Sequence, residues 1–327
     1  MKKGKHAPGR AGGSDAERDA ASSTTRELAT VRDLLRHAVS RFNKAGLFFG
    51  HGNANAWDEA VHLVLHRLHL PLDKLEPFLD ARLLPSEKSA VLELISRRVD
   101  ERMPAPYLTG EAWLGDYRFK VDSRVIVPRS FIAELLLERL APWIAAPDDV
   151  ARVLDLCTGS GCLAIIAADA FPNARVDAVD VSRDALDVAR INVEHYGLGD
   201  RVGLIESDLF ANVSGQRYDL IVTNPPYVND RSMNLLPDEY RREPRIALAG
   251  GPDGLDLVRR ILEAAPRMLA ADGLLVVEVG HERAHVEAAF PRLPITWLST
   301  SGGDDAVFAA RTADLVPAPA ARRKRSR

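Results

Sequence analysis

The feature that most restricts the fold is a strand, a turn with two glycines and a helix that follow one another near the middle of the chain. The apolar segment 152–156 leads into the turn, and the apolar run 162–167 follows it directly. Glycines at such a position let a ligand approach the backbone and present amide N–H groups at the start of a helix. We therefore expect a nucleotide-like cofactor here, with a purely structural tight turn as the alternative. The turn consists of Cys157, Thr158, Gly159, Ser160 and Gly161.

Short apolar segments alternate with helical segments from about Ser130 onward. This alternation predicts a mostly parallel sheet covered by helices on both faces. The fold class expected for residues 130–312 is therefore α/β, with a Rossmann-like sheet of seven strands. The predicted strands are residues 153–156, 176–179, 202–205, 220–223, 274–279, 295–298 and 307–310.

Two further domains are expected before this sheet. Apolar residues recur at helical spacing in three segments of residues 24–105, which predicts a helical domain whose first helix includes Leu28 and is capped by Thr24 or Thr25. Within residues 106–129, apolar and polar residues alternate on both sides of Asp122-Ser123, which predicts a β-hairpin linker with its turn there.

Charge and composition narrow the class of protein. Lys and Arg number 43 against 46 Asp and Glu, so the chain as a whole is not built to coat a polyanion. Residues 1–23 and 313–327 are predicted to be disordered tails; their basic ends could contact RNA weakly or have no partner. Two cysteines exclude a disulfide framework, and no apolar stretch approaches the length of a membrane span. We expect a cytoplasmic protein without a membrane segment, and the nine histidines show no metal-ligand spacing.

Three carboxylates follow or lie within the predicted strands. Asp180 ends the second strand, where an acid can bind ribose hydroxyls; its alternative role is to cap the helix beginning near Ser182. Asp155 lies inside the first strand and needs a hydrogen-bond donor if it is buried. Asp208 and Leu209 follow the third strand, where the carboxylate could accept from an adenine amine, with a simple strand-end turn as the alternative.

The fourth strand ends in Asn224-Pro225-Pro226-Tyr227, which distinguishes between cofactors. The glycine spacing alone also fits dinucleotide-binding proteins. Two prolines give a rigid turn without N–H donors, whose carbonyls can accept from a substrate –NH2 group, and Asn224 adds a side-chain carbonyl. The ring of Tyr227 offers a flat face for a planar amide or base amine. A dehydrogenase has no use for these groups, so S-adenosyl-L-methionine is the expected cofactor. A rigid structural loop is the alternative.

The chain resembles bacterial protein-(glutamine-N(5)) methyltransferases of the class I adenosylmethionine fold, from about Thr25 to Arg311. The resemblance rests on several motifs in combination. They are Tyr107-Leu108-Thr109-Gly110, Phe119-x-Val121-Asp122, Val125-Ile126-Val127-Pro128-Arg129, the glycine turn, Asn224-Pro225-Pro226-Tyr227, Glu243-Pro244 and Asp253-Gly254-Leu255. It implies that residues 157–161, Asp180 and Asn224 contact the cofactor and that residues 224–227 receive the substrate glutamine.

Two branches of the family differ in their substrates, which are release factors or the third protein of the large ribosomal subunit. Release-factor enzymes usually continue Pro-Arg with Pro-Glu-Thr-Glu, whereas Ser130 follows Arg129 here. The segment 47–52 also resembles the ribosomal branch. The resemblance therefore implies methylation of one glutamine in a large-subunit ribosomal protein, with the helical domain recognising that substrate. The alternatives are a release-factor methyltransferase, an adenine amine methyltransferase on nucleic acid, and a non-catalytic ribosome-assembly factor.

Overall fold

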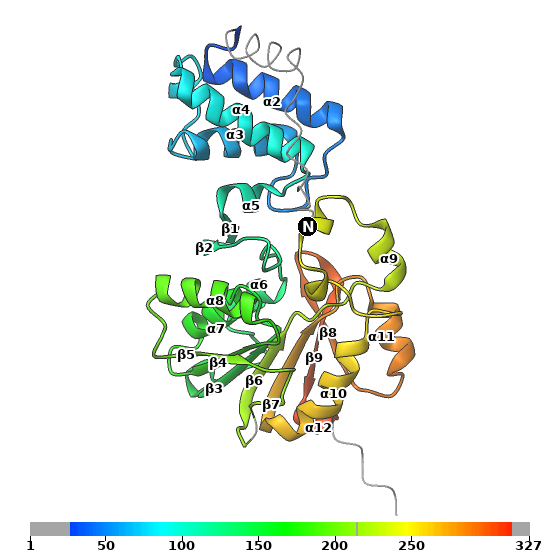
Figure 1. The fold of residues 1–327 in the computed structure, drawn as a ribbon. Helices are drawn as coiled ribbons and strands as arrows, with labels where there is room; N and C mark the ends of the chain where they lie inside the picture. Colours follow the sequence, from blue (N-terminus) through cyan, green and yellow to red (C-terminus); the bar gives the residue numbers. More distant parts are fainter. Residues whose placement is uncertain (1–26, 214, 316–327) are drawn as a thin grey trace, which may run out of the picture. The chain divides into compact units, whose positions relative to one another are not determined.

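The computed structural model describes residues 27–213 and 215–315. The chain divides into two compact units, Met1–Thr109 and Gly110–Arg327, whose elements are labelled in Figure 1. The predicted tail 1–23, most of the predicted tail 313–327 and the predicted caps Thr24 and Thr25 lie outside the described residues. Within those described, no helix is both long enough and apolar enough to cross a membrane.

The first unit is helical, as its periodicity predicts. Its apolar helix faces meet in one core that includes Leu34, Leu63 and Ile95, all at most 1% exposed. A buried ion pair crosses this core, from Arg98 Nε to Glu59 Oε1 at 2.6 Å. The helices are α2 (Val31–Ala45), α3 (Ala56–Arg67), η1 (Glu76–Phe78), α4 (Pro85–Asp100) and α5 (Ala105–Thr109).

The helix expected to include Leu28 begins later than the sequence suggested. Thr30 caps α2: its hydroxyl accepts from the Asp33 N–H, and Asp33 accepts from the Thr30 N–H, so two terminal amide donors are satisfied. Leu28 is buried but lies outside α2. The spacing of Leu28 matches the apolar face of α2 because this residue packs in the same core just before the helix begins.

The second unit begins with a hairpin, but the predicted turn was wrong. Strand β1 (Glu111–Leu114) pairs with β2 (Tyr117–Lys120), so the chain reverses at Gly115-Asp116, where Gly115 has a φ of +58°. Asp122 instead begins a local turn, in which its carbonyl accepts from the Val125 N–H at 3.1 Å. Left-handed backbone favours glycine, and that signal was the better guide to the reversal.

The predicted seven-stranded, mostly parallel sheet is confirmed. Its order is β5-β4-β3-β6-β7-β9-β8, and the last two strands run antiparallel to their neighbours. The chain moves outward from β3 to β4 and β5, and then returns to place β6 on the other side of β3. A crevice therefore opens between the carboxyl ends of β3 and β6. The strands are β3 (Arg152–Leu156), β4 (Arg175–Asp180), β5 (Val202–Glu206), β6 (Tyr218–Thr223), β7 (Leu269–Glu278), β8 (Thr296–Thr300) and β9 (Gly303–Arg311).

Helices cover both faces of this sheet (Figure 1). The short helix α12 (Thr312–Leu315) includes residues assigned above to the C-terminal tail; its Leu315 is 8% exposed and packs in the core with β7 and α10. The unit therefore continues to Leu315. The remaining helices of the unit are α6 (Ile132–Leu137), η2 (Pro147–Asp149), α7 (Cys162–Ala170), α8 (Arg183–His195), α9 (Asp230–Leu235), η3 (Tyr240–Arg242), η4 (Arg245–Ala247), α10 (Asp256–Met268) and α11 (Arg283–Ala289).

Candidate active site

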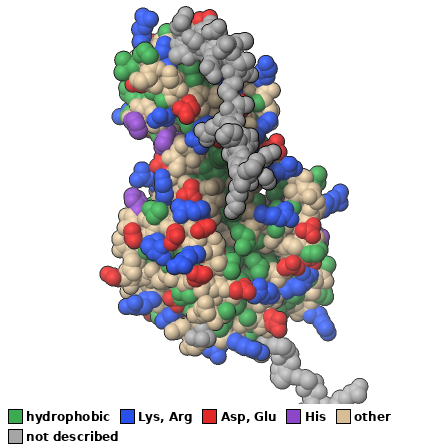
Figure 2. Space-filling model, in the orientation of Figure 1, with side chains coloured by type: hydrophobic (Ala, Val, Ile, Leu, Met, Phe, Trp, Pro, Cys, Tyr) green, Lys and Arg blue, Asp and Glu red, His purple; other side chains and the backbone are tan. Residues whose placement is uncertain are grey.

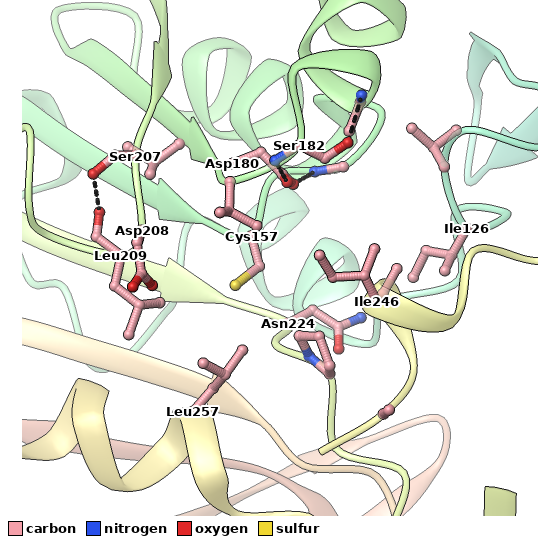
Figure 3. Close-up of a pocket in the computed structure, with 18 of the residues that line it drawn as sticks. Ile126, Cys157, Asp180, Ser182, Ser207, Asp208, Leu209, Asn224, Ile246 and Leu257 are labelled. Atoms are coloured by element: carbon pink, nitrogen blue, oxygen red, sulfur yellow. Dashed lines mark hydrogen bonds between the residues drawn. The ribbon is translucent and has the colours of Figure 1, made fainter. Parts of the chain in front are cut away.

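A cavity of about 370 Å³ lies at the carboxyl ends of β3, β4 and β6 (Figure 3). It brings together seven residues that the sequence selected, from four separate segments of the chain. Apolar side chains that the sequence did not select form much of its remaining wall. The selected residues are Cys157, Gly159, Asp180, Asp208, Leu209, Asn224 and Pro226; the apolar ones include Ile126, Val181, Ile246 and Leu257.

Within the glycine turn, only Cys157 and Gly159 line the cavity. Gly161 lies at the start of α7 with a φ of +80°, and a β-carbon there would stand 3.2 Å from Ala189 Cβ on α8. The carbonyl of Ser160 accepts from Asn192 Nδ2 at 2.8 Å. These two residues therefore hold the shape of the turn rather than contact the cavity.

Asn192 also holds the hairpin. Its side-chain oxygen accepts from the Lys120 N–H at 2.7 Å, while its amide nitrogen donates to the Lys120 carbonyl at 3.0 Å. The side chain is buried, with 1% of the residue exposed. One amide thus joins α8, strand β2 and the turn after β3.

Asp155 is fully buried beneath the turn and does not line the cavity. The required donors are present: Thr158 Oγ1 at 2.5 Å and the Ala164 N–H at 3.1 Å both donate to Oδ2. Thr158 thus braces the turn from below. Oδ1 has no hydrogen-bond partner among the described residues. Burial raises the pKa of Asp155 to about 7, although the Thr158 and Ala164 bonds act in the opposite direction.

Asp180 lies at the end of β4 and faces the cavity (Figure 3). Its Oδ2 accepts from the Gly159 N–H and its Oδ1 from the Ser182 N–H, both at 2.9 Å. Ser182 itself caps α8 by accepting from the Ala185 N–H, so capping does not require Asp180. Burial raises the pKa of Asp180, and the two N–H donors oppose that rise.

The segment after β5 supplies Asp208 and Leu209 to the cavity. Asp208 Oδ2 forms an ion pair with Arg260 Nη2 at 2.8 Å, and both side chains are about half exposed. Leu209 is 7% exposed and has a φ of +49°, a conformation fixed by the Ser207 hydroxyl, which donates to its carbonyl at 2.8 Å. Nothing in the sequence indicates that Arg260 pairs with Asp208, because α10 is distant along the chain.

Asn224 follows β6 directly and lines the cavity with Pro226 (Figure 3). Its side chain makes no hydrogen bond to any residue that the structure describes, and neither does the carbonyl oxygen of Pro225. Polar groups at the edge of a protein cavity without internal partners are available to a ligand. Pro225 and Tyr227 do not line the cavity.

Three glycines accommodate Tyr227. A β-carbon on Gly250 would stand 2.7 Å from Tyr227 Cα, one on Gly254 would collide with the Tyr227 carbonyl, and one on Gly280 would stand 2.6 Å from ring atom Cε2. The ring therefore packs against the backbone at Gly280. Val228 pairs with Leu248 and Gly250 through backbone hydrogen bonds, which fix the end of the turn.

Two buried carboxylates, Glu243 and Glu278, were not predicted from the sequence to belong to the site. Arg129 donates from Nη1 to Glu243 Oε1 at 2.6 Å and from Nη2 to Glu243 Oε2 at 2.7 Å. Glu278, 1% exposed, accepts from Ser130 and lies next to Tyr227. Glu278 could have been predicted, because it directly follows the apolar residues 274–277 of β7. Since β7 neighbours β6 in the sheet, an acid at this position lies near the residues that follow β6.

The thiol of Cys157 points into the cavity on the side of Asn224 (Figure 3). Burial, followed by the nearby Asp180 carboxylate, raises the pKa of this thiol far above its ordinary value. The sulfur therefore stays protonated and serves as a wall of the site, not as a nucleophile. In the residues that the structure describes, no group of three His, Cys, Asp or Glu side chains is arranged to hold a metal ion.

Comparisons with known proteins identify relatives of the chain. The model of the methyltransferase small domain matches residues 132–236. Three curated proteins named ribosomal protein uL3 glutamine methyltransferase are similar to 88% of the chain. They come from Bordetella pertussis, at 64% identity over 96% of that protein, Burkholderia pseudomallei, at 62% over 95%, and Neisseria meningitidis serogroup B, at 59% over 94%.

Proposed function

The chain belongs to the family of ribosomal protein uL3 glutamine methyltransferases, and we propose that it methylates the side-chain amide nitrogen of one glutamine in that ribosomal protein. The products are N(5)-methylglutamine and S-adenosylhomocysteine, which remains when the methyl group leaves the sulfur of S-adenosyl-L-methionine. The observation that carries the proposal is the Asn224 side chain, which lines the cavity where β6 ends and has no hydrogen-bond partner among the described residues; the Pro225 carbonyl is a second acceptor without such a partner in the same turn.

The cavity fits S-adenosyl-L-methionine, which would supply an electrophilic methyl group on a sulfonium. Asp180 would accept from the ribose hydroxyls, beside the backbone of Gly159. Leu209 and Leu257 provide apolar surface for a flat base, and Asp208 is the nearby acceptor for an adenine amine. The turn residues Thr158, Ser160 and Gly161 would act through the shape of the turn, and Asp155 through its support from below.

The residues after β6 account for the choice of an amide nitrogen. The lone pair of an amide nitrogen is delocalised, so it is a weak nucleophile. The Asn224 side-chain oxygen and the Pro225 carbonyl can accept the two N–H hydrogens, which orients the nitrogen and favours the positive charge that develops as the C–N bond forms. One of these N–H protons leaves after transfer. Pro226 keeps the turn rigid and Tyr227 anchors it.

The helical unit is proposed to select the protein substrate. Phe48 leaves 45% of its surface exposed, although its carbonyl is held by Arg98 Nη2 at 2.9 Å. Its neighbour Phe49 packs in the unit's core. An exposed aromatic side chain on backbone that is held in this way suits contact with another protein.

The alternative functions are a nucleic acid methyltransferase, a release-factor methyltransferase and a non-catalytic assembly factor. On the face shown in Figure 2, Lys and Arg alternate with Asp and Glu over each unit, which disfavours a nucleic acid substrate. The basic ends of the tails, proposed as a weak RNA contact, lie outside the described residues. The unpartnered Asn224 amide favours an enzyme over a non-catalytic assembly factor.

The decisive experiment offers labelled S-adenosyl-L-methionine with four substrates: purified uL3, intact large subunits, a release factor and adenine-containing DNA. We expect one added methyl group on a glutamine of uL3, located by peptide mass spectrometry, and far less of it with Asn224→Ala over the same time. Labelling of the release factor or DNA in preference to uL3 would contradict the proposal. Comparison of free uL3 with intact subunits identifies the form recognised.

A further inference from the structure

Glu278 lies beside the proposed catalytic turn because of strand register. Thr223 of β6 pairs with Val277 of β7, so the next residues, Asn224 directly after β6 and Glu278 at the end of β7, lie side by side at this edge of the sheet. Only 1% of Glu278 is exposed. A carboxylate at this depth requires partners, and it is not part of the cavity wall described above.

Both oxygens of Glu278 are used. Oε2 accepts from the Ser130 hydroxyl at 2.5 Å and from the Phe131 N–H at 2.9 Å. Oε1 accepts from the Tyr227 hydroxyl across 3.4 Å, a long hydrogen bond. All three partners donate, and they come from two segments about a hundred residues apart in the sequence. Glu278 therefore ties the start of α6 to the Asn224–Tyr227 turn.

The remaining surroundings leave Tyr227 few alternatives. Its ring packs against the backbone at Gly280, and its main chain is enclosed by Gly250. The hydroxyl is the polar end of this side chain, and it donates to Glu278. Its hydrogen bond to Glu278 links the outer end of the ring, and with it the turn, to the segment that begins α6.

The charged and titratable groups around Glu278 are few. From the segment before α6, Arg129 lies near, but its guanidinium is taken by Glu243 in a bidentate pair and lies over the Tyr240 ring at 5.1 Å. From the turn after β6 there is Tyr227. The residue paired with Glu278 on β9 is Val307, which is uncharged. No second carboxylate accepts from Ser130, Phe131 or Tyr227 among the described residues.

We propose that Glu278, in its ionised form, is a positioning residue that holds the Asn224–Tyr227 turn in the geometry required for methyl transfer. The inference rests on the proposed function. Protonation places a hydrogen on one oxygen of Glu278. The Phe131 N–H cannot accept it, and the Ser130 or Tyr227 hydroxyl can accept it only by giving up its own donation, so the present set of hydrogen bonds is then lost. Burial raises the pKa of Glu278 to about 7, with Ser130 and Phe131 opposing the rise. The turn is therefore released within the neutral pH range.

The test compares the full-length wild type with Glu278→Gln. Gln keeps the size and an acceptor oxygen but cannot ionise. We expect the wild-type kcat at saturating cofactor and uL3 to fall as the pH drops below about 7. Glu278→Gln should have a kcat at pH 8 lower by on the order of tenfold, no acidic limb near pH 7, and an unchanged KM for uL3. Its Tm at pH 8 should equal or exceed that of the wild type, because a buried charge is removed.

The matched control is Glu134→Gln, which alters a carboxylate that accepts from the Ser301 N–H away from the turn; its profile should match the wild type. A wild-type kcat and acidic limb in Glu278→Gln would overturn the inference. So would a loss of kcat that is accompanied by a lower Tm, since that describes a structural role.

A second readout needs no turnover. In protein with ¹³C-labelled tyrosine rings, the Tyr227 signal, assigned with Tyr227→Phe, should shift with a midpoint near pH 7 in the wild type and not in Glu278→Gln. The absence of that shift would overturn the inference. If the wild type fails to methylate uL3, the proposed function fails, while the Tyr227 signal still tests Glu278.

Discussion

Asp180 accepts a hydrogen bond from the backbone N–H of Gly159 at 2.9 Å, so the carboxylate at the end of β4 fixes the turn at the end of β3. Both residues line the cavity. One interaction thus connects the backbone that would approach the cofactor to the carboxylate that would bind its ribose.

Asp180→Ala should weaken binding of S-adenosylhomocysteine by about 1.5–3 kcal/mol, the cost typical of lost hydrogen bonds to a charged group. Isothermal titration calorimetry measures it. The control is Asp219→Ala, because Asp219 also accepts two backbone N–H groups, from Ala151 and Arg152, but at the amino end of β3. Its affinity should be unchanged. Tight binding of NADH without affinity for S-adenosylhomocysteine would refute the cofactor assignment.

Asn224→Ala should lower kcat by on the order of 10²–10³, as for the loss of one preorganised polar group directed at developing charge. The free energy of unfolding should change little, because the Asn224 side chain makes no hydrogen bond within the described residues. Steady-state kinetics on uL3 measures the first quantity and urea denaturation the second. Asn173→Ala, an exposed position before β4, is the control. Wild-type turnover by Asn224→Ala would rule out the mechanism.

Gly280→Ala should reduce kcat while leaving affinity for S-adenosylhomocysteine intact. The new methyl group would stand 2.6 Å from Tyr227 Cε2, so the ring must move. The φ of +53° adds backbone strain of about 1–2 kcal/mol. Gly197→Ala isolates that strain, because its φ is +66° and no atom lies within 4 Å of its new β-carbon. Equal losses of kcat in the two variants would show that Tyr227 is not involved.

Much of this fold and about half of its site were predictable from the sequence. Each strand of the sheet was a short apolar run, because burial on both faces leaves little choice of residue. Asp180 and Asn224 were identifiable since they directly follow such runs. The Asp208–Arg260 and Arg129–Glu243 pairs were not, because nothing local indicates which distant charges meet. The hairpin turn was misplaced because alternation alone does not locate a reversal, whereas Gly115 does.

The free energy of unfolding should fall as the pH rises from about 4 to about 7. The folded-state pKa of Asp155 is about 7 because of burial, above its ordinary 3.8, so the folded chain binds more protons than the unfolded chain in this range. The contribution is at most about 4 kcal/mol. Asp155→Asn should show a smaller fall, measured by urea denaturation without cofactor at several pH values. Identical slopes would exclude a neutral Asp155.

Phe48→Ala should raise the KM for uL3 severalfold and leave kcat at saturating uL3, cofactor affinity and Tm unchanged. The side chain is 45% exposed, so its loss removes contact with a partner rather than core packing. Initial rates at varied uL3 concentration measure the effect. Leu84→Ala, at a 63% exposed residue of the same unit outside the segment 47–52, is the control. An unchanged KM for Phe48→Ala would remove this residue from the recognition surface.

Through the side chain of Asn192, the hairpin also stabilises the turn after β3. The same side-chain amide bonds to the backbone of Lys120 and to the carbonyl of Ser160. If either segment moves away from Asn192, buried polar groups lose their hydrogen-bond partners. Strand β2 therefore stabilises the turn after β3 through Asn192. An insertion at the Gly115-Asp116 tip would keep the hydrogen bonds between Lys120 and Asn192. A β2 that ends before Lys120 would remove them and destabilise the turn after β3, although β2 itself does not line the cavity.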